Sequence, residues 1–88
     1  MKLLWSTGAW QDYLYWRDAN PKLHARINKL IGEIERHPFR GIGKPEPLKG
    51  DFSGCWSRRI DSEHRIVYRV VGKGKEQRLE IIQCRFHY

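Results

Sequence analysis

The chain has 88 residues, of which 17 are Lys or Arg and 10 are Asp or Glu, so its formal net charge at pH 7 is +7. This length suits one small domain, which we place at residues 1–88, and it leaves no room for a cofactor-binding fold with a second lobe. The surplus of cations favours a polyanionic partner such as nucleic acid. A basic surface that contacts only solvent would have the same composition.

Neither a targeting segment nor a membrane span is evident in the sequence. Residues 1–5 are followed directly by Ser6 and a helical pattern, not by the apolar run and small-residue cleavage site of a signal peptide. No run approaches the roughly 20 apolar residues that cross a bilayer. We therefore expect a cytoplasmic, unprocessed protein without membrane contact.

The two cysteines, Cys55 and Cys84, lie in strand-like segments and have neither Cys-x-x-Cys nor zinc-ligand spacing. We expect free, buried thiols in a reducing compartment.

The first third of the chain predicts a short strand followed by two helices. Residues 1–5 are strand-like, and Ser6 is a good N-cap for a helix that follows. Its apolar and aromatic side chains recur every three to four residues, which predicts that they belong to the core; they are Ala9, Trp10, Tyr13, Leu14 and Trp16.

The dipeptide Asn20-Pro21 predicts the start of a second helix, because Asn caps well and Pro suits the first helical position. An apolar stripe then predicts the buried face; it consists of Leu23, Ile27, Leu30, Ile31 and Ile34. The helix should end near His37, because Pro38 cannot continue it. We expect His24 to face solvent, and no metal-ligand partner is spaced for it.

The second half of the chain predicts a β-meander. Residues 55–60, 65–71 and 78–86 are rich in β-branched and aromatic residues and are separated by polar turns. Strands that follow a helix pair are typical of an α+β fold, with a two-helix hairpin packed on a mainly antiparallel, twisted sheet.

A carboxylate between two prolines is the first candidate for chemistry. Pro45 and Pro47 fix their own φ angles, and Pro47 also restricts the backbone of Glu46, so the carboxylate of Glu46 should be presented rigidly. A stiff surface turn with a solvated acid has the same sequence and is the commoner outcome.

Strand alternation separates the cations that follow. Arg59 and Arg65 flank a short turn and can face each other, whereas Arg58 must point to the opposite side of the sheet. Two close guanidinium groups favour an anion between them, and phosphate suits their planar donors. With Glu46 to take a proton and His87 to donate one, the side chains needed for RNA strand cleavage are present.

The sequence also resembles a known family from end to end. The motifs that carry the resemblance are Lys2–Ser6, Trp10–Trp16, Gly43–Lys49, Gly54–Ile60, Glu63–Tyr68 and Cys84–Tyr88. Together they resemble the YoeB branch of the RelE-like toxins. The resemblance implies the RelE-like microbial RNase fold and a bacterial toxin of a type II toxin–antitoxin pair, which cleaves messenger RNA in the ribosomal A site and is held inactive by its antitoxin.

The resemblance also implies residue roles. Glu46 would be the general base, Arg65 the phosphate clamp and His87 the general acid, and Tyr88 would complete the catalytic site. Lys49 and Arg59 would hold the substrate backbone. The implied reaction, attack by a ribose 2′-hydroxyl on the adjacent phosphate, needs no metal or other cofactor. The chain departs from the family pattern in residues 72–77, where the turn is longer and more basic than expected.

The partners implied by the resemblance are a YefM-like antitoxin, the ribosome with its messenger RNA, and operator DNA only as part of the toxin–antitoxin complex. An acidic, partly disordered antitoxin segment would match the net charge of +7. A homodimer is compatible with the resemblance, although no sequence feature demands one.

Two functions of other classes stay open. One is a noncatalytic, basic nucleic-acid-binding module, which would bind RNA without cutting it. The other is a gyrase-poisoning toxin of the ParE kind, which would be expected to lack Glu46 and the terminal His87-Tyr88 pair.

Overall fold

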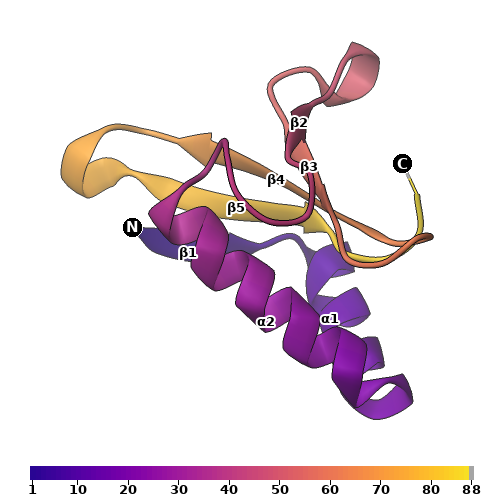
Figure 1. Ribbon diagram of the computed structural model, residues 1–88. Coiled ribbons are helices and arrows are strands. Elements are labelled where there is room, and N and C mark those ends of the chain that lie inside the picture. Colours follow the sequence, from indigo (N-terminus) through magenta and orange to yellow (C-terminus); the bar gives the residue numbers. More distant parts are fainter. Residues whose placement is uncertain (88) are drawn as a thin grey trace.

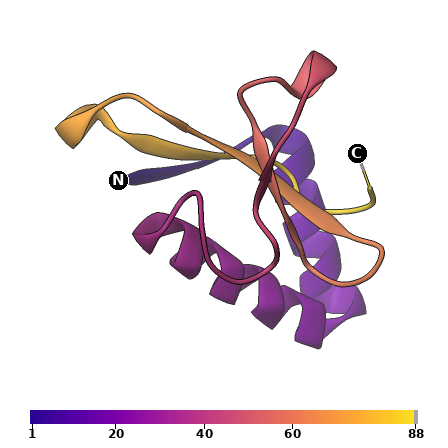
Figure 2. The ribbon, with the colours of Figure 1, turned by 45° about the horizontal axis from the view of Figure 1, so that its top comes forward.

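The computed structural model describes residues 1–87. The strands are Lys2–Trp5 (β1), Glu46–Pro47 (β2), Trp56–Arg59 (β3), Arg65–Val71 (β4) and Arg78–Gln83 (β5). The helices are Thr7–Ala19 (α1) and Pro21–Arg36 (α2), with short 3₁₀ turns at Gly50–Phe52 and Gly74–Glu76. Both helices cover one face of a twisted sheet, as the two views in Figures 1 and 2 show.

The strand order in the sheet is β1-β5-β4-β3-β2. β1 runs parallel to β5, and the pairs β5–β4, β4–β3 and β3–β2 are antiparallel. The predicted α+β fold with a mainly antiparallel sheet is therefore confirmed. The β2 strand was not foreseen; it is an edge strand, where a proline in place of a backbone donor is tolerated.

The predicted helix caps are confirmed. Ser6 Oγ accepts the backbone N–H of Ala9 at 3.0 Å and donates to the carbonyl of Ile82 at 2.7 Å, so the cap also ties α1 to β5. Asn20 follows α1 directly and caps α2, because its Oδ1 accepts the N–H of Leu23 at 3.2 Å. One residue thus turns the chain between the helices.

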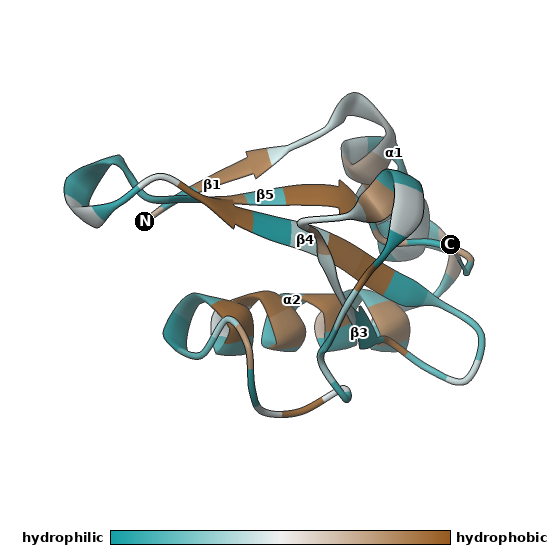
Figure 3. Cartoon of the chain, turned by 90° about the horizontal axis from the view of Figure 1, so that it is seen from above, coloured by the Kyte–Doolittle hydropathy of each residue, from teal (hydrophilic) through white to brown (hydrophobic). Residues whose placement is uncertain are grey.

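The core lies between the helices and the sheet. From the predicted stripe of α2, Ile27, Leu30, Ile31 and Ile34 are buried and Leu23 packs against them partly exposed. The sheet contributes Ile66, Tyr68, Leu79 and Ile81, and Ile60 joins them from the bend directly after β3. Figure 3 shows this distribution: hydrophobic colour runs along β4, β5 and α2, and the connections are mostly hydrophilic.

The prediction that the aromatic face of α1 forms core is only partly right. Ala9 and Trp16 are buried, but Trp10 is 45% exposed and contacts the rings of Trp5 and Tyr13 near the surface. The exposed position of Trp10 therefore lies outside the core-facing side of α1.

The prediction that His24 faces solvent is wrong. Its ring lies 4.3 Å from the ring of Tyr13, centroid to centroid, because the tight turn at Asn20 brings the start of α2 against α1. Its Nε2 is buried.

The last strand is shorter than predicted. β5 ends at Gln83 instead of Phe86, because side chains of α1 bind the backbone of the next residue. Asp12 Oδ2 accepts the N–H of Cys84 at 3.3 Å, and Trp16 Nε1 donates to the carbonyl of Cys84 at 2.8 Å. The chain then turns at Phe86, whose φ is +64°.

Both cysteines are free and buried, as predicted. Within residues 1–87, no helix is long and apolar enough to cross a membrane.

Candidate active site

Three of the predicted site residues lie on one face of the sheet. Glu46 is the register partner of Ser57, and Arg59 is the partner of Arg65. Because Ser57 and Arg59 are two positions apart on β3, all of these side chains share one side. The alternate positions face the helices, since Ile66 on β4 belongs to the core there. The shared face is therefore the one that the helices leave open.

Glu46 sits on a hairpin that projects from this face. Residues 46–59 form the hairpin, which stands on the opposite side of the sheet from the helices in Figures 1 and 2. Leu48 anchors it: the side chain is buried against Cys55 and Val67, and its N–H donates to the carbonyl of Cys55 at 2.9 Å. Glu46 and Lys49 on either side of this anchor are exposed. The hairpin therefore presents both charged groups to solvent from a fixed base.

Backbone carbonyls of the turn between β3 and β4 hold the Arg65 side chain in place. This side chain is buried, and Nη1 donates to the carbonyls of Asp61 at 2.9 Å and His64 at 3.0 Å. Arg59, opposite it on β3, is exposed. One guanidinium group is thus held in place and the other is exposed to solvent, an arrangement that can bind an anion at a defined position.

The carboxylate of Asp61 holds the turn between β3 and β4 together. Asp61 Oδ1 accepts the N–H of Glu63 at 2.9 Å and that of His64 at 2.7 Å, which is an Asx turn. Partial burial acts to raise the pKa of Asp61, but these two backbone donors and the nearby Arg65 guanidinium hold it below its ordinary value. The turn is therefore in its most stable form when Asp61 is ionised.

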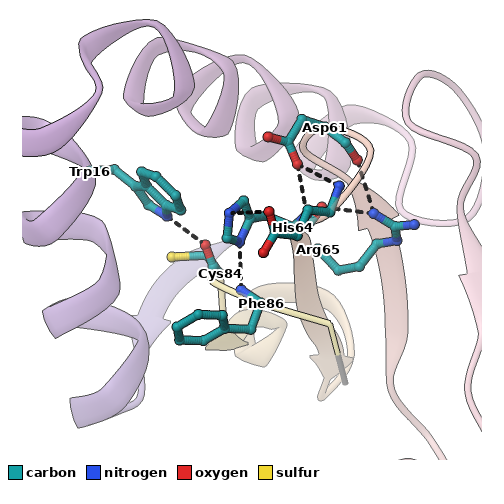
Figure 4. A network of polar contacts seen from close by, with 7 residues as sticks. Trp16, Asp61, His64, Arg65, Cys84 and Phe86 are labelled. Carbon is teal, nitrogen blue, oxygen red and sulfur yellow. Dashed lines mark hydrogen bonds and ion pairs between the residues drawn. The ribbon is translucent and has the colours of Figure 1, made fainter.

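The C-terminal segment reaches the same end of the sheet. The N–H of Arg65 donates to the carbonyl of Phe86 at 3.0 Å, and the N–H of Phe86 donates to Nδ1 of His64 at 2.7 Å (Figure 4). His87, the next residue, is exposed beside the start of β4. The structure thus brings His87 to the strand that carries Arg65. Tyr88, also predicted for the site, lies outside the described residues.

Arg58 has a structural role that the sequence did not reveal. It is fully buried on the helix side, where it donates to the carbonyls of Arg40 at 2.9 Å and Ile42 at 3.2 Å, to the carbonyl of His37, and to the hydroxyl of Tyr68 at 3.2 Å. Burial raises the pKa of Tyr68, although Arg58 opposes the shift. Arg58 therefore fixes the loop that leads to Glu46.

Sequence reasoning also missed Asp61 and His64. The spacing Asp61-Ser-Glu-His64 was a usable signal, because an Asp that starts a polar turn commonly accepts the backbone N–H groups that follow it. The pairing of His64 with Phe86 had no local signal, since the two residues are 22 positions apart.

The family model described as "YoeB-like toxin of bacterial type II toxin-antitoxin system" matches residues 5–88. Toxin YoeB of Escherichia coli K12 is 51% identical over 88 residues, which are 100% of both chains. A solved structure of a YoeB/ParE toxin from Agrobacterium tumefaciens is 58% identical, covers 100% of both chains and superimposes with a TM-score of 0.95.

Two structures from Staphylococcus aureus are 38% identical to the chain and cover 100% of it and 98% of their own chains. One is a heterotetrameric YoeB-YefM toxin-antitoxin complex with a TM-score of 0.87, and the other is a YoeB dimer with a TM-score of 0.88. Since the family model matches almost all of the sequence and full-length relatives share half of its residues, this chain belongs to the YoeB-like toxins of bacterial type II toxin–antitoxin systems.

Proposed function

We propose that this toxin is an endoribonuclease that cleaves messenger RNA in the ribosomal A site and so inhibits translation. The observation that carries the proposal is the arrangement on the open face of the sheet. Glu46, Arg59 and Arg65 share that face, and the segment leading to His87 is hydrogen-bonded to Arg65. A carboxylate, a phosphate-binding pair and an imidazole on one surface are suited to phosphodiester cleavage.

In the proposed reaction, Glu46 takes the proton of a ribose 2′-hydroxyl. The 2′ oxygen then forms a bond to the adjacent phosphorus as the bond between phosphorus and the 5′ oxygen breaks. His87 donates a proton to that departing oxygen. The products are a 2′,3′-cyclic phosphate and a 5′-hydroxyl, and the step as written uses neither water nor a metal ion.

The cations would stabilise the charge that develops on phosphorus. Arg65 is held by two backbone carbonyls, so its position is set before substrate arrives, which is the condition under which electrostatic stabilisation is most effective. The exposed Lys49 and Arg59 would bind the flanking phosphates. A contribution from Tyr88 rests on the sequence resemblance.

The ribosome would hold the messenger RNA in the geometry that an open site cannot impose on it. Glu46, Lys49, Arg59 and His87 are all exposed, so the protein presents an open surface at the predicted site. Cleavage requires the 2′ oxygen, phosphorus and 5′ oxygen to lie nearly in line. Messenger RNA held in the A site would have that geometry imposed on it, whereas free RNA would adopt it only transiently.

The proposed regulator is a YefM-like antitoxin. The net charge of +7 suits an acidic segment that folds over the open face, and the S. aureus relative is seen in a YoeB-YefM complex. The complex, but not the toxin alone, would bind operator DNA. A homodimer is also proposed, since another S. aureus structure is a YoeB dimer.

The experiment adds the purified protein to a translation reaction and maps the 5′ ends of a defined messenger. We expect new 5′-hydroxyl ends at the A-site codon of paused ribosomes. The same RNA without ribosomes should be cut far more slowly. Equal cutting of free RNA would contradict ribosome dependence.

The same preparation separates the two alternatives. An intact messenger bound with a steep salt dependence would indicate a noncatalytic module. An intact messenger together with trapped gyrase–DNA cleavage complexes would indicate a gyrase poison.

A further inference from the structure

A buried histidine holds the segment that carries the proposed acid. His64 Nδ1 accepts the N–H of Phe86 at 2.7 Å. The imidazole lies between two rings, with its centroid 4.7 Å from that of Trp16 and 5.8 Å from that of Phe86 (Figure 4). An amide N–H can only donate, so Nδ1 must be unprotonated in this arrangement. The hydrogen bond therefore requires neutral His64 with its proton on Nε2.

Hydrogen bonds to the N–H and to the carbonyl of Phe86 hold this residue in an unfavourable backbone conformation. Its φ of +64° is in the left-handed region, which is strained for a residue with a side chain of this size. Its N–H is bound by His64, and its carbonyl accepts the N–H of Arg65 at 3.0 Å. These bonds compensate the strain. His87 is joined to Phe86 directly, so they also set the starting direction of the His87 side chain.

His64 links the two halves of the proposed site. Its own carbonyl accepts a hydrogen bond from Arg65 Nη1 at 3.0 Å, and its ring binds the residue before His87. Other contacts hold the segment from α1: Trp16 binds the carbonyl of Cys84, and the guanidinium of Arg85 lies 3.5 Å from the ring centroid of Tyr15. Those contacts fix the segment to the helix layer, whereas His64 fixes it to the turn that holds Arg65.

We infer that His64 is a positioning residue that sets the geometry between the Arg65 guanidinium and the His87 imidazole. What this geometry is used for rests on the proposed function. The hold on Phe86 does not, and it is measurable without RNA.

Two substitutions in the full chain separate the acceptor from the ring. His64→Phe keeps an aromatic ring between Trp16 and Phe86 but has no acceptor. His64→Asn loses the ring but places Oδ1 near the position of Nδ1. Ser62→Ala, at an exposed position in the same turn, is the control. The measurements are amide exchange at Phe86, single-turnover cleavage on programmed ribosomes, and affinity for those ribosomes.

We expect His64→Phe to increase amide exchange at Phe86 at least tenfold and to lower the cleavage rate about 10- to 100-fold at unchanged ribosome affinity, as a misplacement of about 1 Å would. His64→Asn should bring both the amide exchange at Phe86 and the cleavage rate part of the way back to the parental values. Ser62→Ala should change neither quantity. Parent-like exchange and cleavage in His64→Phe would overturn the inference. So would a larger loss in His64→Asn than in His64→Phe, because a purely structural ring would give that result.

Folding failure and failure of the proposed function are kept apart. If His64→Phe does not fold, the tautomer of His64 in the parent protein is the test. Long-range proton–nitrogen NMR spectra should show a protonated Nε2 and an unprotonated Nδ1. The reverse tautomer would overturn the inference. If the parent does not cut messenger RNA, the proposed function fails, and amide exchange at Phe86 still decides whether His64 holds the segment.

Discussion

Arg58 and Arg59 are neighbours in the sequence with opposite environments. Arg58 points to the helix side and is fully buried, whereas Arg59 is exposed on the open face opposite Arg65. The alternation of β3 alone accounts for this division. Strand periodicity could predict that the two arginines diverge, but not that Arg58 would find three loop carbonyls, because that depends on how residues 37–42 fold over it.

We predict that Arg58→Ala destabilises the protein strongly and Arg59→Ala does not. Arg58→Ala removes a fully buried side chain and its hydrogen bonds to three carbonyls of residues 37–42, at a cost of about 3 kcal/mol or more in the free energy of unfolding. Arg59→Ala should stay within about 0.5 kcal/mol of the parent and lower cleavage instead. Urea unfolding of both variants checks this, and similar stabilities would contradict the structural role of Arg58.

Cys84 should be chemically inert in the folded protein. Burial, and secondarily the nearby Asp12 carboxylate, raise the pKa of its thiol to about 12. At pH 8 only about one thiol in 10⁴ is then the reactive thiolate. Peptide mass spectrometry after brief iodoacetamide treatment should find Cys84 unmodified in the native protein and alkylated in urea. Rapid alkylation of the native protein would show that this part of the core opens readily.

At the scale of elements, the loop and hairpin that carry Glu46 depend on a close approach of backbone. Gly43 has a φ of +83°, and its carbonyl accepts the N–H of Arg59 at 2.7 Å. A Cβ there would lie 3.1 Å from Leu30 Cδ2 and 3.2 Å from the carbonyl oxygen of Arg59. Glycine is therefore required by both conformation and space.

We predict that Gly43→Ala lowers the free energy of unfolding by about 1–3 kcal/mol, from strain and overpacking together. It should also reduce cleavage, since it displaces the chain three residues before Glu46. Gly8→Ala is the matched control: a Cβ there meets no atom within 4 Å, and alanine suits the first turn of α1. A Gly43→Ala variant as stable as the parent would mean that the loop can relax without cost.

The elements differed in how far the sequence could predict them. The helix starts at Ser6 and Asn20 were readable because capping is local chemistry. The end of β5 was not, because side chains of α1 that lie more than 60 positions away, Asp12 and Trp16, bind Cys84 and end the strand. The two-residue β2 was also missed, since its pairing with Ser57 and Trp56 depends on the hairpin and not on strand propensity.

At the scale of the whole molecule, the sheet order decides which residues meet. Antiparallel pairing of β2 with β3 and of β3 with β4 places Glu46, Arg59 and Arg65 on one face. The residue types for RNA cleavage could be identified from the sequence. Their common face could be argued only for Arg59 and Arg65, which flank one short turn. The position of His87 depends on long-range contacts of Phe86, which local patterns do not encode.

The most direct measurement is the single-turnover rate at which ribosomes with a defined A-site codon lose intact messenger, for the parent, Glu46→Gln and His87→Gln. Glutamine keeps the approximate size of each side chain but can neither take nor supply the proton, so each variant should be slower by about 10²- to 10⁴-fold. The control, Glu35→Gln, alters an exposed carboxylate on α2 and should cut at the parental rate. Parental rates for both Glu46→Gln and His87→Gln, in folded protein, would contradict the proposed chemistry.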